Sequence, residues 1–225
     1  MKPTVLLLAA AMTFAGPSAA KDAREDVSPA LVARVEKRFS EISGFRGKFR
    51  QIFHDASMGS TEESAGTVAM SRPLKMRWDY KTPFEQTVVS DGRSVYFYVP
   101  SEKRATVAPL GGIINDRSPA LFLAGGKRLG EIFAIKPPRP GDETGEMGGR
   151  ILLSLEPREK SASVTRIVVA VDASDYTIRA LSLFDWAGNR SDMEFLDLET
   201  NVKLEDRFFR FDRPAGVELL EAPKF

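Results

Sequence analysis

The sequence of 225 residues contains no cysteine and a single histidine, His54. Without cysteine the chain has no disulfide, no thiolate metal centre, no cysteine nucleophile and no cysteine to carry a lipid. A metal cluster or a Ser-His-Asp triad would have to use His54, which stands in the turn-like segment HDASMGS (54–60). We interpret His54 as an exposed loop residue. The sequence therefore predicts no metal, no cofactor, no catalytic residues and no enzymatic activity.

The chain also lacks an excess of charge and a long apolar run. Lysine and arginine number 32 against 31 acidic residues, which gives no reason to expect nucleic acid or an anionic membrane as a partner. The apolar run from Val5 to Ala15 is about eleven residues long, whereas a membrane span needs about 20. It follows Lys2 and ends in the small residues of Pro17–Ala20, which is the layout of a secretory signal peptide. We predict a cleaved signal at residues 1–20 and a periplasmic, monomeric domain over residues 21–225.

The hydrophobic pattern of the mature chain changes period at Gly44. Ser28-Pro29 predicts a helix start, and apolar residues follow at helical spacing until Gly44 ends the helix. From Phe45 the period is two, and strand patterns cover 45–53, 68–80, 87–90, 95–99, 151–155, 164–171, 178–185 and 193–198, with FFRF (208–211) and GVEL (216–219) in the tail. The pair at 91–92, Asp-Gly, predicts a hairpin turn. One helix followed mostly by strands predicts a single α+β domain with one strongly curved sheet.

Residues 105–132 interrupt the strand pattern. Ser118-Pro119 predicts a second, short helix that contains Leu121 and Phe122 and ends at Gly125-Gly126. The segment KPPRPGDETGEMGGR (136–150) is rich in proline and glycine, and strand patterns resume on both sides of it. We predict that it is a long exposed hairpin loop.

Large apolar residues gather on one face of the predicted sheet. They are Phe45, Phe49, Phe53, Met70, Leu74, Met76, Trp78, Val88, Val95, Phe97 and Val99. Such a face is either an ordinary core or the lining of a cavity for an apolar ligand, and the pattern leaves both readings open. Arg72, followed by Pro73, stands in the same apolar register, where a guanidinium must find hydrogen-bond acceptors.

Five segments resemble the LolA family of periplasmic lipoprotein carriers, in that family's order. They are FRGKFRQ (45–51), GTVAMSRPLKMRWDY (66–80), QTVVSDGRSVYFYVP (86–100), SPALFLAGG (118–126) and FFRFDRPAGVEL (208–219). Residues 136–149 match the family least. The related outer-membrane receptor has the same fold but is itself a lipoprotein, which the absence of cysteine excludes here.

The resemblance implies an unclosed antiparallel β-barrel whose concave apolar face is covered by short helices that act as a lid. It implies a chaperone that takes acylated lipoproteins from an inner-membrane ABC exporter to the outer-membrane receptor. Arg72, with Pro73, would hold the lid by binding helix carbonyls, and Leu121 and Phe122 would belong to a lid helix. The acyl chains would lie against Phe49, Met70, Leu74, Met76, Trp78, Val88, Val95 and Phe97. The alternative is a lipid- or lipoprotein-sensing regulatory module on the same half-barrel fold.

Overall fold

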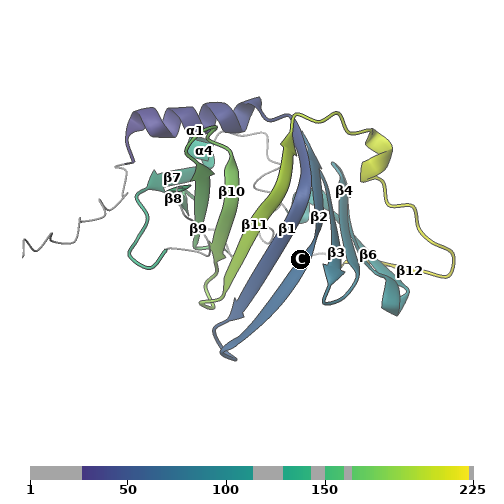
Figure 1. Ribbon diagram of the computed structural model, residues 1–225. Coiled ribbons are helices and arrows are strands. Elements are labelled where there is room, and N and C mark those ends of the chain that lie inside the picture. Colours follow the sequence, from purple (N-terminus) through teal and green to yellow (C-terminus); the bar gives the residue numbers. More distant parts are fainter. Residues whose placement is uncertain (1–26, 114–128, 143–149, 160–163, 223–225) are drawn as a thin grey trace, which may run out of the picture.

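The computed structural model describes residues 27–113, 129–142, 150–159 and 164–222. They form one twelve-stranded sheet and a few helices (Figure 1). The strands are β1 (Gly44–Asp55), β2 (Ser60–Ser71), β3 (Lys75–Thr82), β4 (Gln86–Asp91), β5 (Ser94–Val99), β6 (Arg104–Pro109), β7 (Phe133–Lys136), β8 (Arg150–Pro157), β9 (Arg166–Asp172), β10 (Ile178–Phe184), β11 (Arg190–Thr200) and β12 (Glu218–Glu221). The helices are α1 (Pro29–Glu41), α2 (Leu110–Ile113) and α4 (Leu129–Ile132), with 3₁₀ turns η1 (Pro100–Glu102) and η2 (Asp206–Phe209).

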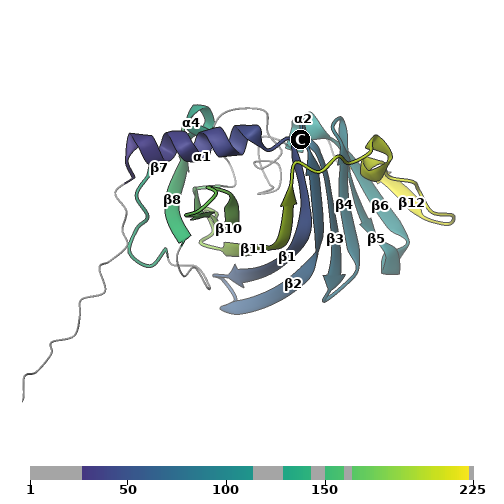
Figure 2. The same ribbon diagram turned by 45° about the horizontal axis from the view of Figure 1, so that its top comes forward.

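The sheet is strongly curved but does not close. Its strand order is β12-β6-β5-β4-β3-β2-β1-β11-β10-β9-β8-β7, so β12 and β7 are the two edges (Figure 2). The neighbours pair antiparallel, except that β12 runs parallel to β6. The predicted fold class, an α+β domain built on an unclosed barrel, is confirmed, with this one parallel pair as a correction to the all-antiparallel expectation.

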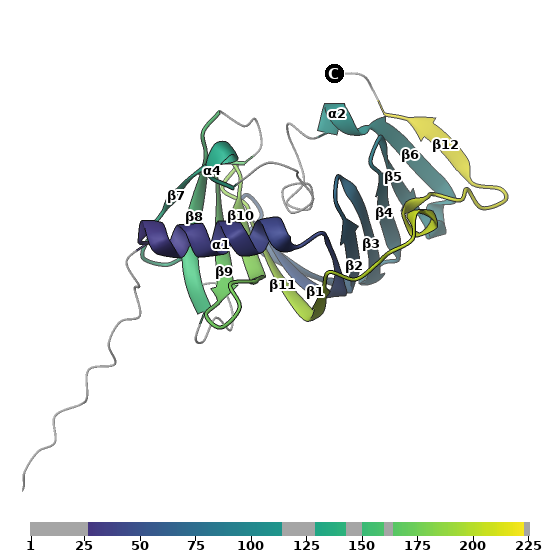
Figure 3. The same cartoon turned by 90° about the horizontal axis from the view of Figure 1, so that it is seen from above.

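Helix α1 lies across the ends of strands β7 to β11, on one side of the curved sheet (Figures 1 and 3). The Ser28 side chain accepts a hydrogen bond from the Leu31 amide at 3.2 Å, and Pro29 occupies the first turn. These are the features of a helix N-terminus that the sequence predicted. Leu31, Val35 and Phe39 form the buried stripe of α1 and join the hydrophobic core of the sheet.

Alternation within β1 decides which face of the sheet becomes the core. Arg46, Lys48 and Arg50 point outward to Glu199, Asp197 and Glu63, at 2.9, 2.8 and 2.6 Å. The intervening Phe45 and Phe49 are buried on the concave side. Since a strand alternates its side chains between two faces, the charged residues fix the aromatic ones in the interior.

Most predicted strands are present, and the predicted Asp91-Gly92 turn joins β4 to β5, with Gly92 at φ +94°. The strands on either side of the predicted hairpin loop, β7 and β8, pair antiparallel, whereas residues 143–149 of that loop lie outside the described residues. Strands β6 and β7 lie in or beside the segment that broke the pattern and were missed. FFRF was wrongly assigned to a strand, since Asp206–Phe209 is a 3₁₀ turn.

The first helix differs from its expected boundary. Gly44 does not end the helix, which stops at Glu41, but opens β1. The predicted signal peptide at 1–20 and the predicted helix with Leu121 and Phe122 lie outside the described residues, so both stay predictions. Among the described residues, no helix is long and apolar enough to cross a bilayer.

Candidate functional site

The concave face is built from ladders of directly paired residues that run across the strands. One ladder passes through Phe45, Met70, Met76, Ser90, Val95 and Ala108. The next passes through Gly47, Val68, Trp78, Val88, Phe97 and Thr106. Directly opposed residues share one face of a sheet, so the register brings the predicted lining residues together.

Seven of the eight predicted lining residues belong to strands of this face. Phe49, Met70, Met76, Trp78 and Val95 are almost fully buried, whereas Val88 and Phe97 are half-buried and pack against the same core. The eighth, Leu74, lies in the turn before β3 with φ +64° and also packs against the core. Phe53, which the alternation placed on this face, is 36 % exposed near the end of β1.

A third ladder lies nearer the hairpin ends of the strands and contains Phe49, Gly66 and Tyr80. The rings of Phe49 and Tyr80 meet edge to face, with centroids 4.9 Å apart. A Cβ on Gly66 would stand 2.0 Å from the carbonyl oxygen of Asp79, so only glycine fits between these two strands. The indole of Trp78 also packs against Phe49, with ring centroids 4.8 Å apart.

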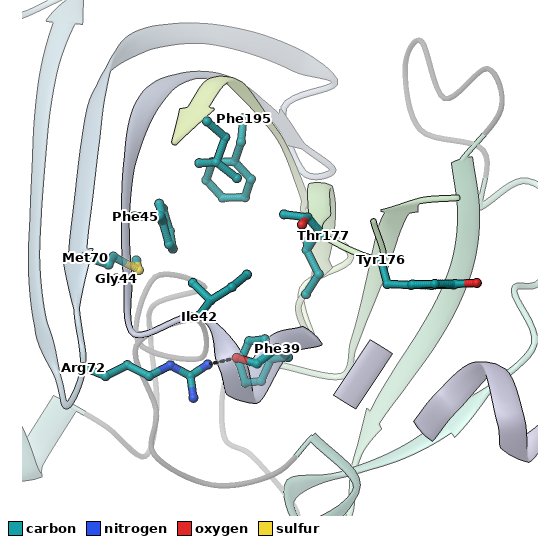
Figure 4. Close-up of a pocket in the computed structure, with 11 residues that line it drawn as sticks. Phe39, Ile42, Gly44, Phe45, Met70, Arg72, Tyr176, Thr177 and Phe195 are labelled. Atoms are coloured by element: carbon teal, nitrogen blue, oxygen red, sulfur yellow. Dashed lines mark hydrogen bonds between the residues drawn. The ribbon is translucent and has the colours of Figure 1, made fainter. Parts of the chain in front are cut away.

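A small cavity of about 40 Å³ lies where α1 meets the concave face (Figure 4). Its lining is mainly apolar and comprises Phe39, Ile42, Gly44, Phe45, Met70, Arg72, Tyr176, Thr177, Ile178, Phe195 and Leu198. Of the predicted site residues that the structure describes, only Met70 and Arg72 border it. A cavity of about 150 Å³ is needed to bind a molecule as small as benzene, so this space holds no acyl chain. The other predicted lining residues on the strands are buried or half-buried and pack in the hydrophobic core.

Arg72 connects the sheet to the helix at this cavity. Its Nη2 donates to the carbonyl oxygen of Phe39, in the last turns of α1, at 2.8 Å, and its guanidinium lies over the Phe39 ring at 4.3 Å (Figure 4). The last carbonyls of a helix lack partners within the helix and carry the negative end of its dipole. No ion pair joins Arg72 to a carboxylate within the described part of the chain.

Burial of the Arg72 guanidinium lowers its pKa from the ordinary value, because the low-dielectric surroundings disfavour the charged form. An arginine keeps its charge in proteins, so the group depends on its acceptor. Pro73, which follows it, is exposed and makes the turn between β2 and β3. The predicted pair thus stands at the helix end of the concave face.

Helix α1 has further polar contacts along its length. Arg38 donates from Nε to Thr177 Oγ1 at 3.0 Å and from Nη2 to Thr200 Oγ1 at 3.1 Å. On another side of the helix, Glu36 Oε1 accepts a hydrogen bond from the Gly130 amide at 2.7 Å. These bonds tie α1 to β11, to the turn before β10 and to α4.

At the far end of the concave face, away from α1, the lining becomes polar. The Tyr80 hydroxyl donates to Gln51 Oε1 at 3.1 Å, and Gln51 Nε2 donates to Ser191 Oγ at 2.8 Å. Burial raises the pKa of Tyr80 to about 12, so its hydroxyl stays protonated at neutral pH. Sequence reasoning did not single out this row, although Gln51 stood in the alternating pattern of β1.

His54 lies at the end of β1 and is no loop residue, which corrects the sequence interpretation. Its Nε2 is 2.9 Å from Asp192 Oδ2, and Arg190 is within 3.1 Å of the same nitrogen. Ser182 Oγ donates to Asp192 Oδ1 at 2.6 Å. In a catalytic triad the serine bonds to the histidine, whereas here Asp192 stands between them, so this arrangement does not activate a nucleophile.

The family comparison matches residues 40–212 to "Outer membrane lipoprotein carrier protein LolA". The chain belongs to the LolA family. Its relatives include an outer-membrane lipoprotein carrier protein of Dechloromonas aromatica, 30% identical over 78% of this chain and 80% of that protein. Another, of Cupriavidus necator, is 31% identical over 86% of this chain and 90% of that protein.

One solved structure agrees with the fold. An uncharacterized conserved protein of Thermus thermophilus superposes with a TM-score of 0.51 at 11% identity, covering 86% of this chain and 98% of that one. A LolA superfamily protein of Nitrosomonas europaea gives a TM-score of 0.46 at 12% identity. The identification as a LolA-family chain therefore rests on the sequence matches.

Several residues of the cavity were missed as site residues. Phe39 and Ile42 were recognised only as apolar positions of the first helix, and Phe195 and Leu198 only as part of a strand. The sequence feature that these four residues share is the apolar periodicity of their helix or strand. That signal does not tell which helix or distant strand closes over the face, because the pairing of β1 with β11 spans most of the chain.

Proposed function

We propose that this LolA-family chain carries acylated lipoproteins across the periplasm, holding their acyl chains against the concave face of the sheet. The observation that carries the proposal is the apolar concave face, at one end of which Arg72 is hydrogen-bonded to the last turns of α1. The predicted lining residues share that face, and the cavity beneath α1 is too small for a chain until the helix moves. A reversible cover over an apolar surface suits a carrier that must load and unload.

The free energy of burying an acyl chain explains why such a carrier is needed. Burial of an acyl chain contributes about 0.8 kcal/mol per methylene, so one chain of about fourteen methylenes is worth ~11 kcal/mol. A lipoprotein with that anchor does not leave a membrane unaided. A carrier that matched the full affinity would in turn retain its cargo.

The contact between Arg72 and α1 would allow the carrier to release its cargo. In the closed state the guanidinium is satisfied by the Phe39 carbonyl, and loading a chain separates them. The free energy of opening is subtracted from the affinity for the lipid, which leaves a complex that can unload. In this proposal Arg72 acts as a lock, and Pro73 positions it.

The partners follow from the direction of transport. We propose that an inner-membrane ABC exporter supplies the cargo and that the outer-membrane receptor accepts it. The cleaved signal at residues 1–20 would direct the chain to the periplasm. Because curated relatives that match over most of their own length bear the carrier name, we favour a carrier over the sensing module.

The test is to purify the protein gently from its own periplasm and to analyse the bound material by mass spectrometry. Diacylated or triacylated lipoprotein bound at about one molecule per protein is the expected result. Binding of a regulatory protein without acylated cargo would favour the sensing module and overturn the proposal.

A further inference from the structure

Trp78 carries a polar atom whose burial the closed structure does not explain. Its indole is 2 % exposed, and Nε1 has no hydrogen-bond partner among the described residues. The indole packs on Phe49 and Phe195, with centroids 4.8 and 6.3 Å away, so it lies inside the concave face. A buried donor left without an acceptor costs about 1–3 kcal/mol, and buried indole N–H groups usually find a partner.

The polar row begins at the next position of β3 on the same face, Tyr80. Trp78 and Tyr80 are two residues apart in β3 and therefore point to the same side of the sheet. Tyr80, Gln51 and Ser191 form a hydrogen-bonded chain across β3, β1 and β11. All four groups are uncharged, and together they give the concave face one polar end.

The opposite end of the face is the one that α1 and Arg72 close. Tyr80 lies four positions after Met76 in β3, which is about 13 Å at the rise of a strand. The apolar ladders of Met76 and Trp78 fill this interval. The face therefore has a direction, with an apolar length toward α1 and a neutral polar end toward the hairpins.

We propose that the Trp78 N–H and the adjoining row of Tyr80, Gln51 and Ser191 bind the ester or amide carbonyl at the head of the acyl chains. The chains then lie along the apolar ladders toward α1, and the protein part of the cargo leaves at the hairpin end. The inference rests on the proposed function and adds which part of the lipid is recognised. A neutral site of this kind accepts a neutral carbonyl and disfavours the carboxylate of a free fatty acid, which would need a cation.

The experiment uses two synthetic lipopeptides with a fluorescent label and equal chain length. One carries two ester-linked acyl chains on a thioglyceryl cysteine, and the other carries two ether-linked alkyl chains without carbonyls. Fluorescence anisotropy gives each Kd for the unaltered protein and for Trp78→Phe, which removes the N–H and keeps an aromatic ring. We expect the unaltered protein to prefer the ester ligand about three- to tenfold, and Trp78→Phe to lose that preference.

Two further variants separate recognition from packing. Tyr80→Phe removes the hydroxyl that holds Gln51, and we expect a smaller loss confined to the ester ligand. Val88→Ala changes the apolar ladder of Trp78, and it should weaken both ligands to the same extent. Circular dichroism and thermal melting establish that each variant is folded.

The outcomes distinguish this inference from the proposed function. If the unaltered protein binds both lipopeptides equally, or if Trp78→Phe and Tyr80→Phe weaken both equally, the carbonyl site is wrong and the carrier function stands. If neither lipopeptide binds to the unaltered protein, both proposals fall.

Discussion

At the scale of single residues, two polar groups lie on the apolar face, and they differ in whether they have a hydrogen-bond acceptor. The Arg72 guanidinium is paired with the Phe39 carbonyl, whereas Trp78 Nε1 is buried without an acceptor. A buried polar group is tolerated when it is hydrogen-bonded and costs free energy when it is not. In the proposed function, Arg72 would favour the closed, empty state, and Trp78 would favour a state in which a ligand supplies the acceptor.

Replacing Arg72 by leucine keeps much of its volume and removes its donors, so the sheet is expected to fold. The closed state loses a hydrogen bond from a charged group, worth about 1.5–3 kcal/mol. That free energy opposed loading, so the variant should bind acylated ligand about ten- to a hundredfold more tightly. Loading from inner-membrane vesicles should persist, and transfer to the receptor should fail.

The matched control for this prediction is Arg46→Leu, which removes an exposed arginine of the outer face. It should load and release like the unaltered protein. An Arg72→Leu variant that loads poorly but releases normally would contradict the lock and would make Arg72 a direct contact of the ligand.

A second prediction concerns Tyr80, whose pKa burial raises from 10.0 to about 12. Because the unfolded chain ionises this phenol at lower pH than the folded protein, its contribution is fully present below pH 10. It is lost as the pH rises toward 12, at about 1.4 kcal/mol per unit. Urea unfolding at pH 9 and pH 11 should show a larger loss of stability in the unaltered protein than in Tyr80→Phe. Equal losses would show that Tyr80 does not carry the effect.

At the scale of elements, α1 is the part whose attachment differs most from its surroundings. The strands are joined by continuous ladders, whereas Arg38, Glu36 and Arg72 hold the helix through a few side-chain hydrogen bonds. Its buried stripe supplies the remaining attachment. Elements held by few polar contacts open at lower free energy than the body of a sheet.

Arg38→Met should loosen α1 selectively. The substitution keeps an apolar stem and removes the donors to Thr177 and Thr200. Hydrogen exchange of the α1 amides should accelerate about three- to tenfold, as expected for one or two hydrogen bonds, while exchange in β1 and β2 is unchanged. Lys37→Met, on the exposed side of the same helix, is the control and should alter neither. Faster exchange throughout the sheet would instead indicate a global loss of stability.

The elements also differ in how well the sequence predicted them. Period-two patterning predicted β1 to β5 and the shared face of Met70, Met76 and Trp78. Alternation and turns depend on residues that are close together in the sequence, so the sequence alone indicates them. It missed β6 and β7, which are short, and β6 is paired in parallel with β12 from the far end of the chain. The contact of His54 with Asp192 depends on a strand that is 138 positions away. Pairing between distant strands leaves no local mark.

The candidate site, too, was predictable from the sequence only in part. Arg72 was recognisable because a charge in an apolar register requires an acceptor, but the identity of that acceptor, the Phe39 carbonyl, depends on how α1 crosses the sheet. The polar row of Tyr80, Gln51 and Ser191 combines three strands, and each residue alone is unremarkable in its own strand. Only the assembled sheet makes the row continuous.

At the scale of the whole molecule, the cavity between α1 and the concave face is small compared with the proposed cargo. The cavity beneath α1 is about 40 Å³, whereas pockets for small molecules measure about 300–1,000 Å³. The sheet has two unpaired edges, β12 and β7, so it can widen without breaking a closed barrel. Loading should therefore move α1 and one half of the sheet apart.

The absence of cysteine makes this movement measurable, because introduced cysteines are the only sites that a thiol-reactive spin label can modify. Lys37→Cys on α1 and Lys81→Cys near the end of β3 place labels at side chains that are 77% and 63% exposed. Pulsed electron resonance should give one narrow distance for the empty protein and a longer, broader distribution with diacyl lipopeptide. Adding Arg72→Leu should populate the longer distances without ligand, since the lock that favours the closed state is gone. If lipopeptide binds at one per protein and the distance does not change, the acyl chains occupy a site that needs no movement of α1, and the lock at Arg72 has no role in release.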